Sequence, residues 1–178
     1  MTDRSPVLVP IDSSKCRGRR QELVTFWRAK GLLSLETDPD YAHWYLGASS
    51  AAAYPQLLFE YIHVYDGGHR FVPMEDCLGW EARCPNCKSS LDEVLFGLRD
   101  DWPDDSEDEQ TSMHDWTVPC PTCAEEPLLS SLVTANAAVT PFYVHLGYGD
   151  LGEDGGVQFL ADLGQFMGTS FKVLWLNL

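Results

Sequence analysis

The sequence of 178 residues is short of positive charge. It has 12 lysine and arginine residues against 27 aspartate and glutamate residues, which gives a net charge of −15. Because proteins bind nucleic-acid phosphates mainly through lysine and arginine, this balance disfavours a nucleic-acid partner. Seven of the basic residues lie within residues 1–30, which carry a charge of +4, and the rest of the chain carries −19. Such an acidic chain favours a basic protein partner, or it simply keeps the protein soluble.

The sequence also lacks the segments that direct a chain into a membrane or out of the cell. No apolar run approaches the ~18 residues that a membrane-spanning helix needs. Residues 1–10 have neither a long apolar core nor a small-residue cleavage site. Four of the six cysteines stand in two Cys-x-x-Cys pairs, which is typical of metal or redox use in a reducing compartment. We therefore expect a cytoplasmic protein that does not associate with membranes.

Recognisable catalytic motifs are missing as well. No serine lies in a nucleophile-elbow motif, and no pair of carboxylates stands out from the general acidity. Among the five histidines, His63 and His145 fall in predicted strands and are interpreted as structural residues. His114 lies close to the second cysteine pair, where it is either structural or a hydrogen-bond donor to a thiolate. An enzyme whose site we do not recognise stays one hypothesis.

The clearest positive feature is a pair of matching cysteine motifs. Residues 80–87 and 116–123 share the pattern W-x3-C-P-x-C, and the second copy follows the first by 36 residues. A Cys-x-x-Cys turn directs both sulfurs at one point, so two such turns complete a tetrahedron around one metal ion. A set of four protein ligands leaves no open position, which makes the site structural and not catalytic. We predict a zinc site with the ligands Cys84, Cys87, Cys120 and Cys123.

Other uses of the cysteines stay open. The two pairs could act as independent redox motifs, although a redox pair normally lies at a helix N-terminus, and the tryptophan-led entry suits a strand instead. Iron or an iron–sulfur cluster is another occupant of a four-thiolate site. Cys16 and Cys77 stand alone and are interpreted as buried apolar residues. Cys77 becomes a ligand only if one of the four predicted ligands is not.

Residues 80–124 resemble zinc-ribbon modules, which are built from two such cysteine knuckles. Lys88 and Ala124 depart from the ribbon pattern, because glycine often follows the second cysteine of a ribbon knuckle. The 32 residues between the pairs also exceed the common spacing of about 15–20. The excess is an acidic stretch, residues 100–110, which we predict to be a disordered linker. Since many zinc-ribbon modules bind nucleic acids, the resemblance implies that function as an alternative.

The first two thirds of the chain predict helices and one hairpin around this insert. Residues 1–14 suggest an extended and loosely held segment, and residues 17–33 predict an N-terminal helix. Residues 57–74 predict a β-hairpin with its turn at Asp66-Gly67-Gly68-His69. Shorter helices are expected at residues 48–53, 91–98 and 125–138.

The C-terminal third predicts a βαβ unit. Its parts are a strand at 139–146, a helix at 157–167 and a nearly all-apolar strand at 170–176, which we expect in the interior of a sheet. The whole chain then reads as an α+β fold and a single domain over residues 1–178. Its expected parts are a mixed sheet, an N-terminal helix, a β-hairpin, a zinc-ribbon-like insert at 80–124 and the C-terminal βαβ unit.

The turn Gly147–Gly152 matches the pattern G-x-G-x-x-G between a predicted strand and a predicted helix, as in dinucleotide-binding sites. Asp150, Glu153 and Asp154 would surround a pyrophosphate with negative charge. We therefore interpret the segment as a flexible turn and leave open whether it binds a ligand.

These features together predict a small acidic cytosolic protein with a structural zinc site. We expect it to act as an adaptor or an immunity-type interaction protein for a basic partner. The alternatives are a zinc-ribbon protein that binds nucleic acid and an enzyme with an unrecognised site.

Overall fold

The computed structural model describes residues 4–38, 43–47, 50–72, 80–99, 102, 112–152, 154 and 156–177. These residues form a curled, antiparallel sheet of six strands in the order β2-β3-β4-β5-β1-β6. The strands are β1 (Arg4–Pro10), β2 (Leu33–Asp38), β3 (His43–Leu46), β4 (Tyr61–Val72), β5 (Ala138–Gly147) and β6 (Phe171–Asn177). The helices are α1 (Arg20–Ala29), α2 (Ser50–Ala53), α3 (Asp92–Leu98) and α4 (Val157–Met167). This content agrees with the expected α+β class.

The chain divides into two compact units. Apart from the last two residues, unit 1 comprises Met1–Gly67 and Phe142–Leu176, and unit 2 comprises Gly68–Pro141. Each unit has a hydrophobic core of its own. In the chain, unit 2 is an insertion that is entered along β4 and left along β5. The single domain that we predicted for residues 1–178 stays a prediction.

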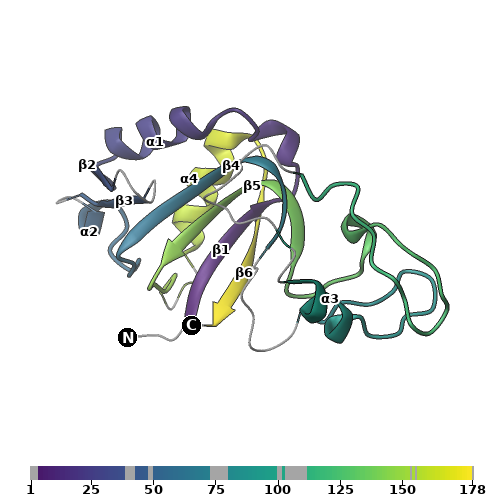
Figure 1. The fold of residues 1–178 in the computed structure, drawn as a ribbon. Coiled ribbons are helices and arrows are strands. Elements are labelled where there is room, and N and C mark those ends of the chain that lie inside the picture. Colours follow the sequence, from purple (N-terminus) through teal and green to yellow (C-terminus); the bar gives the residue numbers. More distant parts are fainter. Residues whose placement is uncertain are drawn as a thin grey trace. The chain divides into compact units, whose positions relative to one another are not determined.

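Unit 1 is a sheet whose core lies under two amphipathic helices. Figure 1 shows α1 and α4 beside the strands of this unit. Apolar side chains recur along both helices at the helical period, so each helix buries one face. The two helices also contact each other, since the rings of Phe26 and Phe166 stack at 4.2 Å. The buried helix residues in this core are Leu23, Val24 and Trp27 from α1 and Phe159, Leu163 and Met167 from α4.

The predicted β-hairpin at residues 57–74 is wrong. The strand β4 continues through Asp66–His69, where we expected a turn. The carboxylate of Asp66 accepts hydrogen bonds from the backbone N–H groups of Gly18 (2.9 Å) and Arg20 (3.1 Å). It thereby satisfies donors at the start of α1, whose own N-cap side chain makes no capping bond. Asp66 therefore serves as a tertiary cap for a helix and does not form a turn.

The sheet is antiparallel and not mixed, because β1 lies between the two strands of the expected βαβ unit. The segments β5, α4 and β6 form where they were predicted, but β5 pairs with β1, in which Val7 lies opposite His145. The N-terminal segment is therefore an interior strand, and Leu8 is completely buried. The last strand, β6, lies at an edge of the sheet and not in its interior. These were errors of strand order, which local pattern does not specify.

Four further predictions concern unit 2. The helix expected at 125–138 is wrong: only a 3-10 turn at Leu129–Ser131 forms there, and Val133 makes an isolated β-bridge with Arg83. The short helix at 91–98 is confirmed as α3. Cys77 and, except for Trp102, the acidic linker at 100–110 lie outside the described residues, so those predictions are untested.

Candidate metal centre

The four predicted ligands come together in unit 2. The ligand atoms of Cys84, Cys87, Cys120 and Cys123 all lie within 4.8 Å of one another. The Sγ atoms of Cys84 and Cys123 are 3.8 Å apart, and those of Cys87 and Cys120 are 3.6 Å apart. Each close pair joins one cysteine of the first motif to one of the second. Four soft sulfur donors at these distances are compatible with one tetrahedral metal ion.

Both motifs fold into the same backbone turn. In the first, Cys84 N–H donates to the carbonyl of Ser89 (3.0 Å), and Lys88 N–H donates to the carbonyl of Cys84 (3.0 Å). In the second, Cys120 N–H donates to Glu125 (2.8 Å), and Ala124 N–H donates to Cys120 (2.9 Å). The repeated sequence pattern thus produces a repeated geometry, which places the two cysteines of each turn on the same side.

The residue after each pair adopts the left-handed conformation. Lys88 has a φ of 64° and Ala124 a φ of 58°. Only glycine adopts this region without steric cost, which explains why ribbon knuckles often have glycine at this position. The two departures noted in the sequence therefore leave the turn intact but add strain to it.

Ser89 is a site residue that the sequence interpretation missed. Its Oγ lies 3.0 Å from the Sγ of Cys87 and 3.3 Å from the Sγ of Cys120, so it bridges the two motifs. The contact with Ser89 and the backbone N–H groups of the second turn lower the pKa of the Cys120 thiol to about 6, and Ser89 also lowers the pKa of the Cys87 thiol. Both thiols are thereby biased toward the thiolate form that binds a metal. The pKa of the neighbouring Cys123 thiol is raised, by burial and by its contacts with the other sulfurs. The signal for the role of Ser89 in the sequence was the position of a serine two residues after a Cys-x-x-Cys pair.

An aromatic core holds one side of the cluster. Cys84 and Cys120 are buried and belong to the core of unit 2, whereas Cys87 is exposed. The first lead-in tryptophan, Trp80, contacts the ring of Phe71 edge to face at 5.3 Å and lies 5.5 Å from Trp102. The second lead-in residue, Trp116, packs against the same core while partly exposed. Trp80 therefore anchors the first knuckle by full burial, and Trp116 anchors the second by partial burial.

Among the side chains that the structure describes, no histidine joins the cluster. His114 lies with its ring 4.6 Å from that of His69, and its backbone N–H donates to Ser112 Oγ (3.3 Å). In unit 1, His63 contacts the edge of Tyr143 at 6.0 Å, and His145 contacts Tyr61 at 5.9 Å. These contacts between rings agree with structural roles for His63 and His145.

The glycines of the G-x-G-x-x-G turn are needed for packing within unit 1. A side chain at Gly147 would overlap the ring of Tyr61, and one at Gly149 would overlap Phe59. A side chain at Gly152 would come within 2.6 Å of the carbonyl oxygen of Gln56. The segment 56–61 thus covers the three positions that a dinucleotide site would use for close approach of the pyrophosphate. Contacts between these glycines and residues 56–61 therefore explain the G-x-G-x-x-G spacing without a bound ligand.

The basic residues near α1 are largely bonded within unit 1. Arg19 donates to the carbonyls of Phe166 and Met167, at 3.3 and 3.2 Å. Lys15 donates to the carbonyl of Gly168 at 2.9 Å. These carbonyls end α4, where a helix has unsatisfied acceptors and a partial negative charge. Two of these basic side chains therefore cap the C-terminal end of α4.

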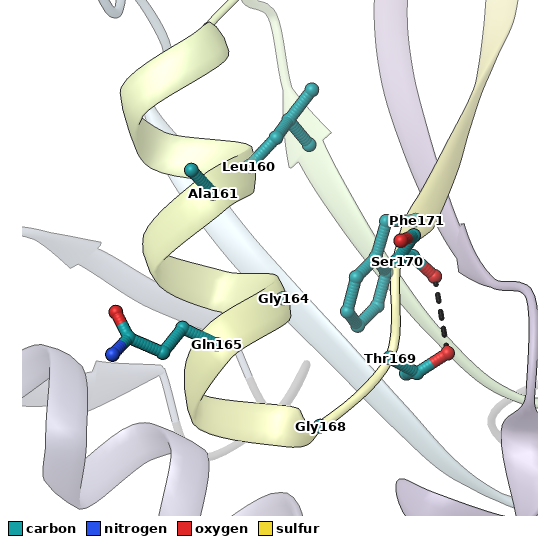
Figure 2. A pocket seen from close by; sticks show the side chains of 8 residues that line it. All are labelled: Leu160, Ala161, Gly164, Gln165, Gly168, Thr169, Ser170 and Phe171. Atoms are coloured by element: carbon teal, nitrogen blue, oxygen red, sulfur yellow. Dashed lines mark hydrogen bonds between the residues drawn. The ribbon is translucent and has the colours of Figure 1, made fainter.

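A cavity of about 500 Å³ lies between the second half of α4 and the start of β6. Figure 2 shows Leu160 on the helix side and Phe171 on the opposite side. No residue that lines the cavity has an acidic, basic or thiol side chain, so it supplies no general acid or base. The lining residues are Leu160, Ala161, Gly164, Gln165, Gly168, Thr169, Ser170 and Phe171.

Three further findings bear on function. Among the residues that the structure describes, none of the helices combines the length and the apolar character that crossing a bilayer requires. Within the same described residues, the four cysteines form the cluster of side chains that could hold a metal ion. Comparisons of the chain with protein-family models, with curated proteins and with solved structures gave no match.

Proposed function

We propose that this chain is a zinc protein with a structural site, and that it acts as an interaction or adaptor protein for a basic partner. The observation that carries the proposal is the convergence of four cysteine sulfurs within 4.8 Å on two turns of matching geometry. Thiolates in this number favour zinc, and four protein ligands leave no position for a substrate or water. The metal therefore stabilises unit 2 and does not take part in a reaction.

The zinc-ribbon description is part of the same proposal. Two cysteine turns with matched hydrogen bonds, each followed by a residue in the left-handed conformation, support it. The bridge between Arg83 and Val133 adds a short β contact beside the first turn. A four-thiolate site holding iron is the alternative occupant.

The interaction role rests on charge. The net charge of −15 favours a basic protein partner over nucleic acid. The nucleic-acid alternative relied on the basic segment at residues 1–30, and it is weakened because Lys15 and Arg19 cap α4 while Lys30 pairs with Asp162 at 3.2 Å. Reduced cysteines and an acidic surface suit an adaptor or immunity-type protein in the cytoplasm.

Metal analysis of the purified protein tests the zinc site. We expect about one zinc ion per chain, a loss of zinc in Cys84→Ser, and unchanged zinc in the control Cys16→Ala, because Cys16 is buried in the core of unit 1. Wild-type protein with neither zinc nor iron would overturn the proposal. Iron in place of zinc would overturn the choice of metal and keep the structural role.

Affinity capture from lysate at low and at high salt tests the interaction role. We expect basic proteins to be retained at low salt and released at high salt, since screening weakens attraction between exposed charges. Failure to retain any protein at low salt, or retention of proteins without a basic bias, would contradict it.

A further inference from the structure

Three tyrosines gather at one end of the sheet in unit 1. Tyr45 on β3 lies directly opposite Tyr61 on β4 in the antiparallel register, so both side chains extend from the same face of the sheet. The ring of Tyr148, just after β5, lies 6.0 Å from the ring of Tyr61 and nearly perpendicular to it, at 81°. Tyr45 and Tyr148, the two neighbours of Tyr61, are 44% and 55% exposed, so both present ring surface to solvent.

Tyr61 is held rigidly as the base of this cluster. Its ring lies over Gly147, where any side chain would overlap it. The ring of His145 meets it at 86° from a further side. Burial raises the pKa of Tyr61, so the phenol stays neutral at physiological pH. The base of the cluster is thus an uncharged aromatic ring.

Tyr148 occupies its position at a conformational cost. Its φ is 52°, in the left-handed region that favours glycine and asparagine. Its backbone N–H donates to Ser5 Oγ at 3.0 Å, and Ser5 is completely buried, so the strained conformation is fixed by a buried contact. Strain of this kind at a bulky exposed residue is found where a side chain is positioned for binding.

We propose that Tyr45, Tyr61 and Tyr148 form an aromatic cage that binds a cationic side chain, lysine or arginine, of the basic partner. A cation is attracted to the faces of aromatic rings, and rings set at right angles surround it from more than one side. The overall charge of −15 favours a cation over an anion at this site. The inference rests on the proposed interaction function, because it names the group by which the partner is recognised.

Two-dimensional NMR of the whole zinc-loaded protein tests the cage, with tetramethylammonium chloride as the probe. Neopentyl alcohol, which has the same shape without charge, and sodium chloride at equal ionic strength are the controls. We expect saturable shifts of the backbone signals of Tyr61, Gly147 and Tyr148 with the ammonium ion alone. Equal shifts with the neutral alcohol, or shifts spread over the acidic surface without saturation, would overturn the cage.

Variants of Tyr148 separate binding from folding. Tyr148→Gly removes one wall and also relieves the left-handed strain, so the protein should be as thermostable as the wild type while binding the probe about three- to tenfold more weakly. Tyr148→Phe keeps the ring and should bind like the wild type. If both variants bind the ammonium ion as the wild type does, the tyrosines have only a structural role.

A lysine-rich peptide and its norleucine counterpart distinguish failure of the cage from failure of the proposed function. Wild type that binds the lysine peptide, with Tyr148→Gly weaker in its affinity, supports both. Equal binding by wild type and Tyr148→Gly overturns the cage and leaves the preference for a basic partner. No preference for lysine over norleucine by the wild type at low salt overturns the preference for a basic partner.

Discussion

Removing zinc with a chelator should unfold unit 2 selectively. Unit 2 spans Gly68–Pro141, and twelve of its described residues form its core. For a segment of this length, a hydrophobic core rarely supplies more than ~3–5 kcal/mol of stability. A structural zinc ion in a small module contributes about 10–16 kcal/mol. The metal therefore supplies most of the stability of unit 2, which should lose most of its protection against opening when the metal is removed.

Unit 1 should survive the same treatment. Nineteen of its described residues form a separate core, and none of them is a cysteine of the cluster. Its strand pairing, such as Val7 opposite His145, does not involve the metal. The stability of this unit therefore depends on packing between the sheet and the helices α1 and α4.

Hydrogen exchange followed by mass spectrometry measures both units at once. With chelator, peptides from 80–99 and 112–137 should lose protection, because the turn amides of Cys84 and Cys120 lose their hydrogen bonds. Peptides from β1 and α4 should keep their protection. Added zinc should restore the protection of the peptides from 80–99 and 112–137. Unchanged protection at 80–99 in the presence of chelator would refute the claim that the metal stabilises unit 2. Loss of protection in both units together would refute their independence and would favour one cooperative domain.

Two further predictions concern single residues. Ala124→Gly should stabilise the protein by about 0.5–1 kcal/mol, because glycine adopts φ 58° without the steric cost that alanine has there. The matched change Ala161→Gly, within α4, should destabilise it by about 1 kcal/mol, and destabilisation by both in thermal unfolding would contradict the left-handed turn. Burial and the hydrogen bond to Asp162 (2.9 Å) raise the pKa of Tyr54, so the stability from neutral Tyr54 is complete below about pH 10 and is lost as the pH rises through the folded pKa. In urea unfolding, Tyr54→Phe should therefore flatten the alkaline loss of stability, and an unchanged pH profile would contradict the assignment.

Local pattern was sufficient for the parts of the molecule whose geometry is local. The helical period predicted α4 at 157–167 with the bounds that the structure has. Apolar residues three and four positions apart form the buried face of a helix, so this signal is local in the sequence. The repeated W-x3-C-P-x-C motif predicted the convergence of four sulfurs, because each Cys-x-x-Cys turn positions its own two ligands. The motif did not reveal Ser89 as the bridge between the turns, since that contact joins residues 31 positions apart.

The sequence by itself determined the two cysteine turns, the amphipathic helices and the acidic balance of this protein. Only the tertiary structure decided that β1 lies between β5 and β6, that β4 runs straight through Gly67-Gly68, and that Tyr45, Tyr61 and Tyr148 meet. The physical reason is that a strand's hydrogen bonds are made to segments far away in the chain. Its neighbours are chosen by the burial of a shared face and by caps such as Asp66, which local pattern does not record.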